Sequence, residues 1–287
     1  MADRYTIDRE RALLPKARLT EFYAKRDQED QYEYQWGYIN PVASAYWRMR
    51  DALLHQAVTA RFNTLRQPLR VLEIGSGFGH ELAKFGALGI RQGNLTGIDI
   101  VSERVQRARM LYPSMTFLEQ DATCLEFSED SFDIVCQFTC VMHGETPDMQ
   151  RKICREMVRV LRPGGLILWW DLAPLRWRIL LFRALFNLFS EDQSRKLALL
   201  DMKDAMMELV FPSERSKATE RRRDPHIIPI SLEDIRGFFD GLDIQANSAG
   251  LDYYIWEALW PRHPTLAEWL WRKAWLSHHG FAIVQKA

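Results

Sequence analysis

Apolar runs and helical periodicities alternate between about Arg70 and Asp171. Short apolar runs with the composition of buried strands occupy residues 71–74, 95–98, 115–118, 132–136 and 166–169. Residues 102–111 have a helical pattern, and a second helix follows Thr146 and Pro147, which suit the N-cap and the first helical position. This alternation predicts a parallel sheet with helices on both faces.

The pattern resumes near the end of the chain. Ser231 and Asp234 match a capping box, so a helix is expected from there, followed by strands near residues 243–251 and 280–284. Two stretches lie outside this arrangement. One is the segment up to residue 67, with a predicted helix over 42–65, and the other spans residues 172–228.

The strand at 71–74 runs directly into three glycines, and a helical pattern begins at His80. A strand, a glycine turn and a helix N-terminus favour a nucleotide-binding corner, since glycine admits a tight turn and the helix end offers unpaired N–H groups. The spacing Gly75-x-Gly77-x-Gly79 differs from the G-x-G-x-x-G pattern of dinucleotide sites, because His80 stands where that pattern needs glycine.

An acidic residue, Glu73, precedes the glycines, and this arrangement resembles motif I of class I S-adenosylmethionine-dependent methyltransferases. Other motifs of that family follow in order. Asp99 ends the second strand, Asp121-Ala122 follows the third, and Arg162-Pro163-Gly164-Gly165 precedes the fifth. We therefore identify the chain as similar to this family, in its small-molecule branch.

The resemblance implies an α/β fold with a seven-stranded, mostly parallel, doubly wound sheet. An N-terminal helical extension or lid would occupy residues 1–67, the cofactor-binding core residues 68–171 and 229–287, and a cap inserted after strand five residues 172–228. In the family, such additions shape the substrate pocket. Tyr23, Arg26 and Asp27 are candidates for a lid over the cofactor.

S-adenosyl-L-methionine is the implied cofactor. The glycines would frame its amino-acid end, Asp99 would hold the ribose, and Asp121 with Ala122 would lie beside the adenine. The full set of implied cofactor-binding residues is Glu73, Gly75, Ser76, Gly77, Gly79, Asp99, Ile100, Asp121, Ala122 and Gln137. No metal is implied, because no acid pair matches a magnesium site.

Methyl transfer depends on aligning the acceptor with the methyl group, and a base is needed only for a protonated acceptor. Ligands of open parallel sheets bind beyond the carboxyl ends of the strands. The catalytic candidates there are His143 and Glu145 after strand four and Asp171 at the end of strand five. Helix capping, helix-terminus electrostatics and a structural turn are the respective alternatives. His278 and His279 are weaker candidates.

Composition limits the partners. The 287 residues carry 38 basic and 38 acidic side chains, and this balance argues against nucleic-acid binding. Four cysteines without a C-x-x-C pair indicate buried free thiols. The N-terminus has no apolar signal segment and no run is long enough to span a bilayer, so a cytoplasmic protein is expected.

We expect an enzyme that methylates a small apolar or aromatic metabolite at nitrogen, oxygen or carbon. One alternative is a peripheral membrane methyltransferase for a lipid-linked or quinone-like acceptor, since residues 177–189 could form an interfacial helix. Packing of that helix as a cap is the other reading. A non-catalytic cofactor-binding module and a homo-oligomer also stay open. Tryptophans crowd the C-terminal region and suit core packing or a pocket.

Overall fold

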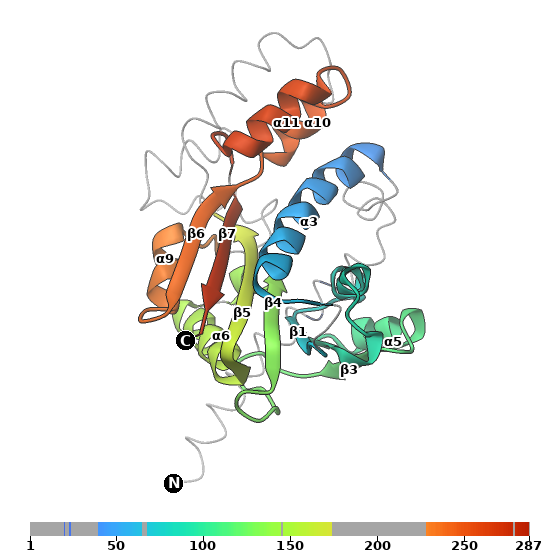
Figure 1. Ribbon diagram of the computed structural model, residues 1–287, viewed down its shortest axis with the longest axis vertical. Coiled ribbons are helices and arrows are strands. Elements are labelled where there is room, and N and C mark those ends of the chain that lie inside the picture. The colour runs from blue at the N-terminus through green and yellow to red at the C-terminus, as the bar shows by residue number, and fades with distance from the viewer. Residues whose placement is uncertain are drawn as a thin grey trace.

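The computed structural model describes residues 20, 23, 40–64, 68–144, 146–173, 228–277 and 279–286. Its centre is a seven-stranded sheet in the order β3-β2-β1-β4-β5-β7-β6 (Figure 1). The strands are β1 (Val71–Ile74), β2 (Leu95–Asp99), β3 (Thr116–Glu119), β4 (Phe132–Phe138), β5 (Leu161–Leu172), β6 (Asp243–Ala249) and β7 (His279–Gln285). Strands β1 to β5 pair in parallel, whereas β7 is antiparallel to β5 and β6. The prediction of a mostly parallel, seven-stranded sheet is confirmed.

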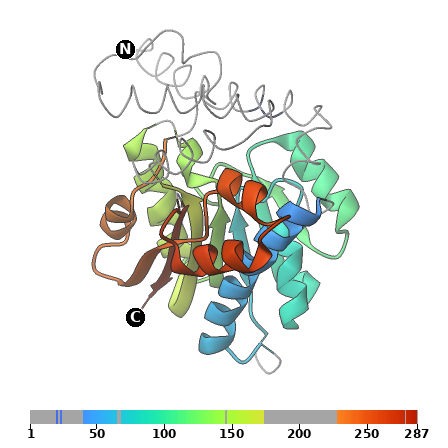
Figure 2. The same ribbon diagram turned by 90° about the horizontal axis from the view of Figure 1, so that it is seen from above.

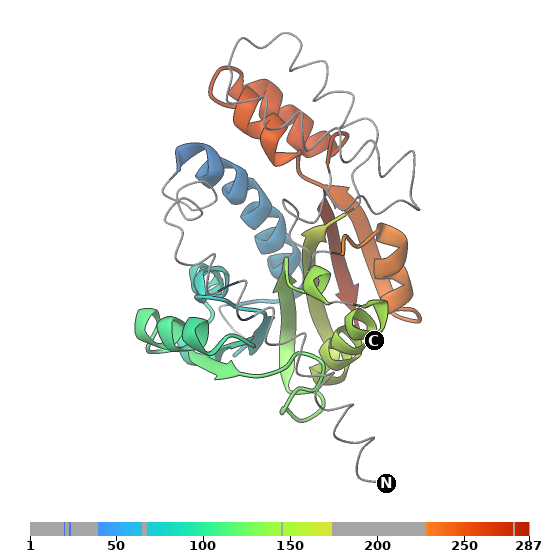
Figure 3. The same cartoon turned by 180° about the vertical axis from the view of Figure 1, so that it is seen from behind.

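Helices cover both faces of the sheet (Figures 1 and 3). They are α3 (Pro41–Arg61), α4 (His80–Ala83), α5 (Ser102–Leu111), α6 (Pro147–Val160), α9 (Leu232–Phe238), α10 (Tyr253–Leu259) and α11 (Pro264–Lys273), with short 3-10 turns η1 (Lys84–Leu88), η2 (Gln92–Asn94) and η3 (Val141–His143). The predicted caps form: the Thr146 side chain accepts from Met149 N–H, and Ser231 with Asp234 makes a capping box.

Strand alternation divides the core into two layers. In β5, Leu168 and Trp170 pack in the layer that includes α3, α4 and α5, while Ile167 and Trp169 pack in the layer under α6 and α9. All four side chains are buried, as expected for a central strand covered on both faces.

Helices α10 and α11 form a pair that the sequence did not predict. They lie in the connection between β6 and β7, above the carboxyl ends of β4 and β5 (Figures 1 and 2). The Asp252 side chain caps α10 by accepting from Ile255 N–H, and Trp256 Nε1 donates to the Val42 carbonyl of α3 at 2.8 Å. This pair therefore packs against the beginning of α3 at the edge where ligands of parallel sheets bind.

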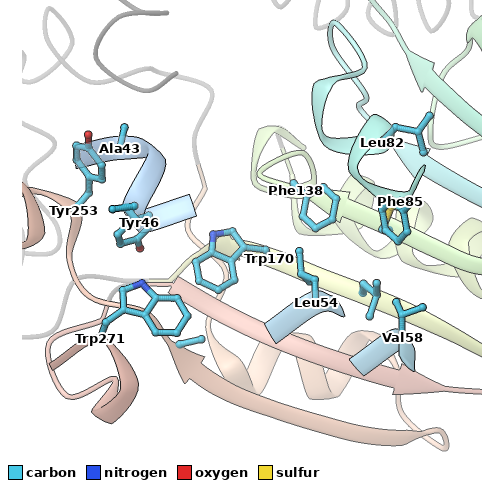
Figure 4. Packing of buried hydrophobic residues seen from close by; sticks show 14 of the residues in the cluster. Ala43, Tyr46, Leu54, Val58, Leu82, Phe85, Phe138, Trp170, Tyr253 and Trp271 are labelled. Carbon is cyan, nitrogen blue, oxygen red and sulfur yellow. The ribbon is translucent and has the colours of Figure 1, made fainter. Parts of the chain in front are cut away.

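Tyr46 joins these elements (Figure 4). Its hydroxyl donates to the Leu251 carbonyl at 2.9 Å and lies 3.2 Å from His279 Nδ1. Its ring makes edge contacts with Trp256 and Trp271. Since Tyr46 is fully buried, this one side chain connects α3 to α10, to α11 and to the start of β7.

The predicted domain boundaries are not tested, because residues 174–227 and most residues before 40 lie outside the described ranges. Helix α3 ends at Arg61, four residues before the predicted limit. Buried free thiols are found at Cys136 and Cys154, whereas Cys140 is half-buried and Cys124 exposed. Among the helices in the described part of the chain, none is long and apolar enough to cross a membrane.

Replacing Tyr46 with Phe removes the donor to the Leu251 carbonyl while keeping the ring. We expect the free energy of unfolding in urea to fall by about 1–3 kcal/mol, since that buried carbonyl loses this partner. Tyr112→Phe is a matched control, because its hydroxyl bonds His80 Nδ1 in an exposed setting and its loss should change stability by less than about 0.5 kcal/mol. Equal effects of the two substitutions would contradict the role given to Tyr46.

Candidate active site

The glycine loop after β1 is a close-packed turn. Gly75, Gly77 and Gly79 have φ values of 69°, 51° and 83°, in the left-handed region that other residues avoid. A Cβ on Gly75 would lie 2.4 Å from Cys140 Sγ, and one on Gly79 would lie 2.5 Å from Phe117 Cζ. Gly77 is less crowded, since a Cβ there would meet only Arg104 Nη1, at the van der Waals distance of 3.9 Å. Of the three glycines, Gly77 is therefore the one whose backbone a ligand could approach most readily.

Asp99 fixes this loop to the end of β2. Its Oδ2 accepts from Gly77 N–H at 2.8 Å and its Oδ1 accepts from Val101 N–H at 2.9 Å. Burial raises the pKa of this carboxyl, while the Val101 N–H, the nearby Arg104 guanidinium and the Gly77 N–H act in the opposite direction. The carboxyl thus lies directly beside the backbone of Gly77.

Glu73 lies under the same loop. Its carboxyl accepts from the Leu82 N–H at the start of α4, and burial raises its pKa well above the ordinary value, with the Glu81 carboxylate adding to the effect. One Glu73 oxygen and the Ser76 hydroxyl are buried with no hydrogen-bond partner among the described residues. This contact joins the end of β1 to α4 across the glycine turn, and the role of Glu73 in organising that turn stays a prediction.

An ion-pair network connects α4 to α3. Arg50 pairs with Glu81 and with Asp51, and Lys84 pairs with Glu81 at 2.7 Å. The Arg50 side chain is only 4% exposed and its guanidinium lies over the Phe138 ring, 5.3 Å from the centroid. Buried charges are tolerated when they are paired, so this network ties the helix after the glycine loop to the long N-terminal helix.

On the side predicted for the adenine, Asp121 is exposed and its Oδ1 accepts from both the backbone N–H and the hydroxyl of Thr123 at 2.8 Å. Ala122 is half-buried. Ile100 is also half-buried and packs against Tyr23 and Val101. These residues follow neighbouring strands, since β2 and β3 pair in parallel, so they lie at one edge of the sheet.

Two of the predicted site residues, Gln137 and Asp171, accept hydrogen bonds from the backbone of the loop after β4. Gln137 Oε1 accepts from Cys140 N–H at 2.9 Å and from Val141 N–H at 3.3 Å. Asp171 Oδ2 accepts from Met142 N–H at 3.1 Å, and its Oδ1 accepts from its neighbour's N–H. Burial raises the pKa of Asp171 to about 7. Each of these two side chains thus bonds the backbone of the loop that carries His143.

His143 ends η3 and is 8% exposed. Its Nε2 lies 2.8 Å from the Tyr23 hydroxyl, and the two rings make an edge contact. The Arg104 guanidinium lies over the Tyr23 ring, 3.8 Å from the ring centroid. Tyr23 therefore bridges the loop after β4 and the elements after β2. This places the Tyr23 side chain at the site, and its role in a lid over the cofactor stays a prediction.

Most of the remaining candidates lie outside the described residues, and one lies in the core. Glu145, Arg26, Asp27 and His278 lie outside the described residues, as does the 177–189 segment. His279 is buried against Trp170 and Tyr46 in the core, with its ring stacked on Trp170. Arg104 was not predicted from the sequence. The only indication of a role there is its position on the helix that follows Asp99.

The residues present fit S-adenosylmethionine. The uncrowded backbone at Gly77, the adjacent Asp99 carboxyl and the Ser76 hydroxyl, which is buried without a hydrogen-bond partner, would supply contacts for a polar, amino-acid-bearing nucleoside. Asp99 would hold the ribose hydroxyls and the glycine loop the amino-acid end. Within the described ranges, no group of three or more His, Cys, Asp or Glu side chains could hold a metal ion.

Comparisons with known proteins indicate the family. Residues 71–165 match the family described as a methyltransferase domain. The 2-methyl-6-phytyl-1,4-hydroquinone methyltransferase of Synechocystis sp. is 32% identical over 150 residues, covering 47% of this chain and 45% of that protein. The ubiquinone/menaquinone biosynthesis C-methyltransferase UbiE of Shewanella oneidensis is 26% identical over 181 residues, covering 59% of this chain and 70% of that protein.

Among solved structures, the PH0226 protein from Pyrococcus horikoshii OT3 shares the fold, with a TM-score of 0.52 and 16% identity over 90% of this chain and 99% of that one. The chain carries a class I S-adenosylmethionine-dependent methyltransferase domain, with the cofactor motifs on the fold that this class uses. It spans 45% of the length of the Synechocystis relative and 70% of the Shewanella one.

Replacing Asp99 with Ala removes a buried carboxyl that the cofactor ribose would contact. Since a hydrogen bond to a charged group contributes about 1.5–3 kcal/mol, we expect S-adenosylmethionine affinity to fall roughly a hundredfold in calorimetry. Asp148→Ala, at a carboxylate that is 83% exposed on α6, is the control and should bind normally. Unchanged affinity in a folded Asp99→Ala protein would refute the assignment.

The raised pKa of Asp171 predicts that the stability of the protein depends on pH. Its pKa in the folded protein, about 7, lies above the ordinary value of 3.8, so the neutral acid favours folding and its contribution is lost as pH rises. Relative to Asp171→Asn, the wild-type free energy of unfolding should fall by at most about 4 kcal/mol between about pH 4 and pH 8. Urea titrations across that range test this, and a pH-independent difference would be inconsistent with it.

Proposed function

We propose that this protein transfers the methyl group of S-adenosylmethionine to a small apolar acceptor, with a quinone-like or other lipid-linked ring as the favoured class. The observation that carries the proposal is the position of His143. Its imidazole lies in the loop after β4, held by Tyr23, on the carboxyl edge that also bears the glycine loop and Asp99. A group able to take a proton thus lies at the same edge as the cofactor contacts.

The bound cofactor supplies an electrophilic methyl carbon on a sulfonium centre. The protein's own residues bind the cofactor, orient the acceptor and shield both from water. Gly77 and Asp99 hold the cofactor, while Gln137 and Asp171 fix the backbone of the loop that presents His143. A hydroxyl or activated ring carbon of the acceptor loses a proton as it is methylated, and His143 is positioned to accept it.

Support for an apolar acceptor comes from two sources. Of the two relatives named above, one is named a methyltransferase of a phytyl hydroquinone and the other a C-methyltransferase of ubiquinone and menaquinone biosynthesis. In this chain, Phe138, Trp170 and Trp271 are buried core side chains in one layer with α3, α10 and α11 (Figure 4). An apolar layer of this kind next to the site edge suits a flat apolar ring better than a charged metabolite.

His143→Gln tests the proposed role. With S-adenosylmethionine and a panel of short-chain quinols, we expect kcat to fall about 100-fold or more while cofactor affinity stays within about twofold, because general-base catalysis contributes about 10²–10⁴-fold. His263→Gln, at an exposed histidine, is the matched control. Tyr23→Phe should show a smaller loss, since it removes only the hydroxyl that holds the imidazole.

Formation of S-adenosylhomocysteine and of a methylated quinol is followed by mass spectrometry. Cofactor binding without turnover on any acceptor would indicate a non-catalytic binding module instead. Turnover unaffected by His143→Gln would leave the methyltransferase activity intact but remove His143 from the proton transfer.

A further inference from the structure

The outer face of α11 is an unusual surface. Among the described residues, the exposed large hydrophobic side chains are Met110, Leu111, Leu266, Trp269 and Trp275, and three of these belong to α11 or to the turn that follows it. Trp269 is 53% exposed and Leu266 is 47% exposed. A half-exposed indole beside an exposed leucine is a feature of contact surfaces more than of free ones.

Helical geometry separates this face from the core. Ala267, Leu270 and Trp271 are buried on the inner side of α11. Leu266 and Trp269 are three residues apart, so they lie next to one another on the outer side. The helix therefore carries apolar side chains on both sides, and only the inner side has a partner in the described part of the chain.

The outer face of α11 also carries positive charge. Arg272 and Lys273 are exposed and neighbour Trp269 on the helix, three and four residues further on, and Arg262 is exposed just before α11 begins. Glu268 is the exposed acid on α11. The whole chain has a formal net charge of zero, so this local excess of positive charge is not a general property of the protein. Tryptophan and leucine flanked by arginine and lysine suit a lipid–water interface, where indole lies at the headgroup level and cations meet anionic lipids.

Location connects the surface to the site. Helix α11 lies above the carboxyl ends of β4 and β5 (Figures 1 and 3), the edge at which His143 and the glycine loop are found. An acceptor of the proposed class is dissolved in a membrane. A protein resting on α11 would therefore have its site edge turned toward the bilayer.

We propose that the outer face of α11, formed by Leu266, Trp269, Arg272 and Lys273, docks the protein on the surface of an anionic lipid bilayer. This deepens the proposed function by stating how a membrane-dissolved acceptor would be met. A second copy of this chain fits the surface less well. A two-fold interface would bring each basic cluster against its own copy, and like charges in contact oppose association.

Vesicle co-sedimentation tests docking directly. The full chain should sediment with mixed phosphatidylcholine–phosphatidylglycerol vesicles and much less with pure phosphatidylcholine. Leu266→Ser with Trp269→Ser should weaken binding at least tenfold, because two apolar side chains no longer enter the interface. The matched control is Met110→Ser with Leu111→Ser, a pair that is 76% and 46% exposed on α5 and should bind like wild type.

A second variant keeps the test decisive if the first misfolds. Arg272→Gln with Lys273→Gln should weaken binding to anionic vesicles roughly fivefold per charge at low salt, and the difference from wild type should shrink at high salt. Circular dichroism and urea unfolding confirm that each variant is folded. Absence of wild-type co-sedimentation, or an equal loss in the α5 control, would overturn the proposal.

Two further measurements separate the outcomes. Size-exclusion chromatography shows whether Leu266→Ser with Trp269→Ser converts a dimer to a monomer. That result without vesicle binding would make the surface a self-association site and refute lipid docking. Methyl transfer to a short-chain, water-soluble quinol should be unchanged in the α11 variants. If it is absent in wild type as well, the proposed activity fails independently of docking.

Discussion

The carboxylate of Asp99 joins two loops that the sheet alone would leave independent. It accepts one N–H from the glycine loop after β1 and one from the turn after β2. Strands β1 and β2 are parallel neighbours, so both loops emerge at the same edge, and one buried acid satisfies donors in each. The placement of Val101 in turn supports Tyr23, which reaches His143. Much of the cofactor side of the site thus depends on one desolvated carboxyl group.

The features that could be predicted from the sequence are those encoded over short distances. A four-residue apolar strand, glycines at alternate positions and an acid at the next strand end are local signals, and the structure has each of them where expected. The contact between His143 and Tyr23 could not be predicted from such local signals. Tyr23 lies 120 positions away, and only the folded chain brings the two together. For Asp171, the sequence placed the acid at the correct edge. It could not show that the carboxyl accepts backbone N–H groups inside the loop.

Helices α10 and α11 escaped prediction for a physical reason. Periodicity reveals a helix when one side is polar and the other apolar. In α11, the apolar positions form one broad arc, of which Leu270 and Trp271 face the core and Trp269 is exposed, so the sequence alone does not separate the inner side from the outer side. Tertiary contacts explain the inner side, in particular the ring contacts between Tyr46 and Trp271. The outer side is explained by no contact within the described residues.

Ala249 and His279 are direct partners across β6 and β7, so the connection that contains α10 and α11 leaves and re-enters the sheet at neighbouring points. A loop whose ends are already held together can change length at little entropic cost, because closure entropy grows only slowly with the number of residues. The helical pair is therefore held in place mainly by its packing on α3, through Trp256 and Tyr46, rather than by the strands that it connects. An insert that kept these inner contacts could present a different outer surface without altering the strand register or the contacts of Asp99.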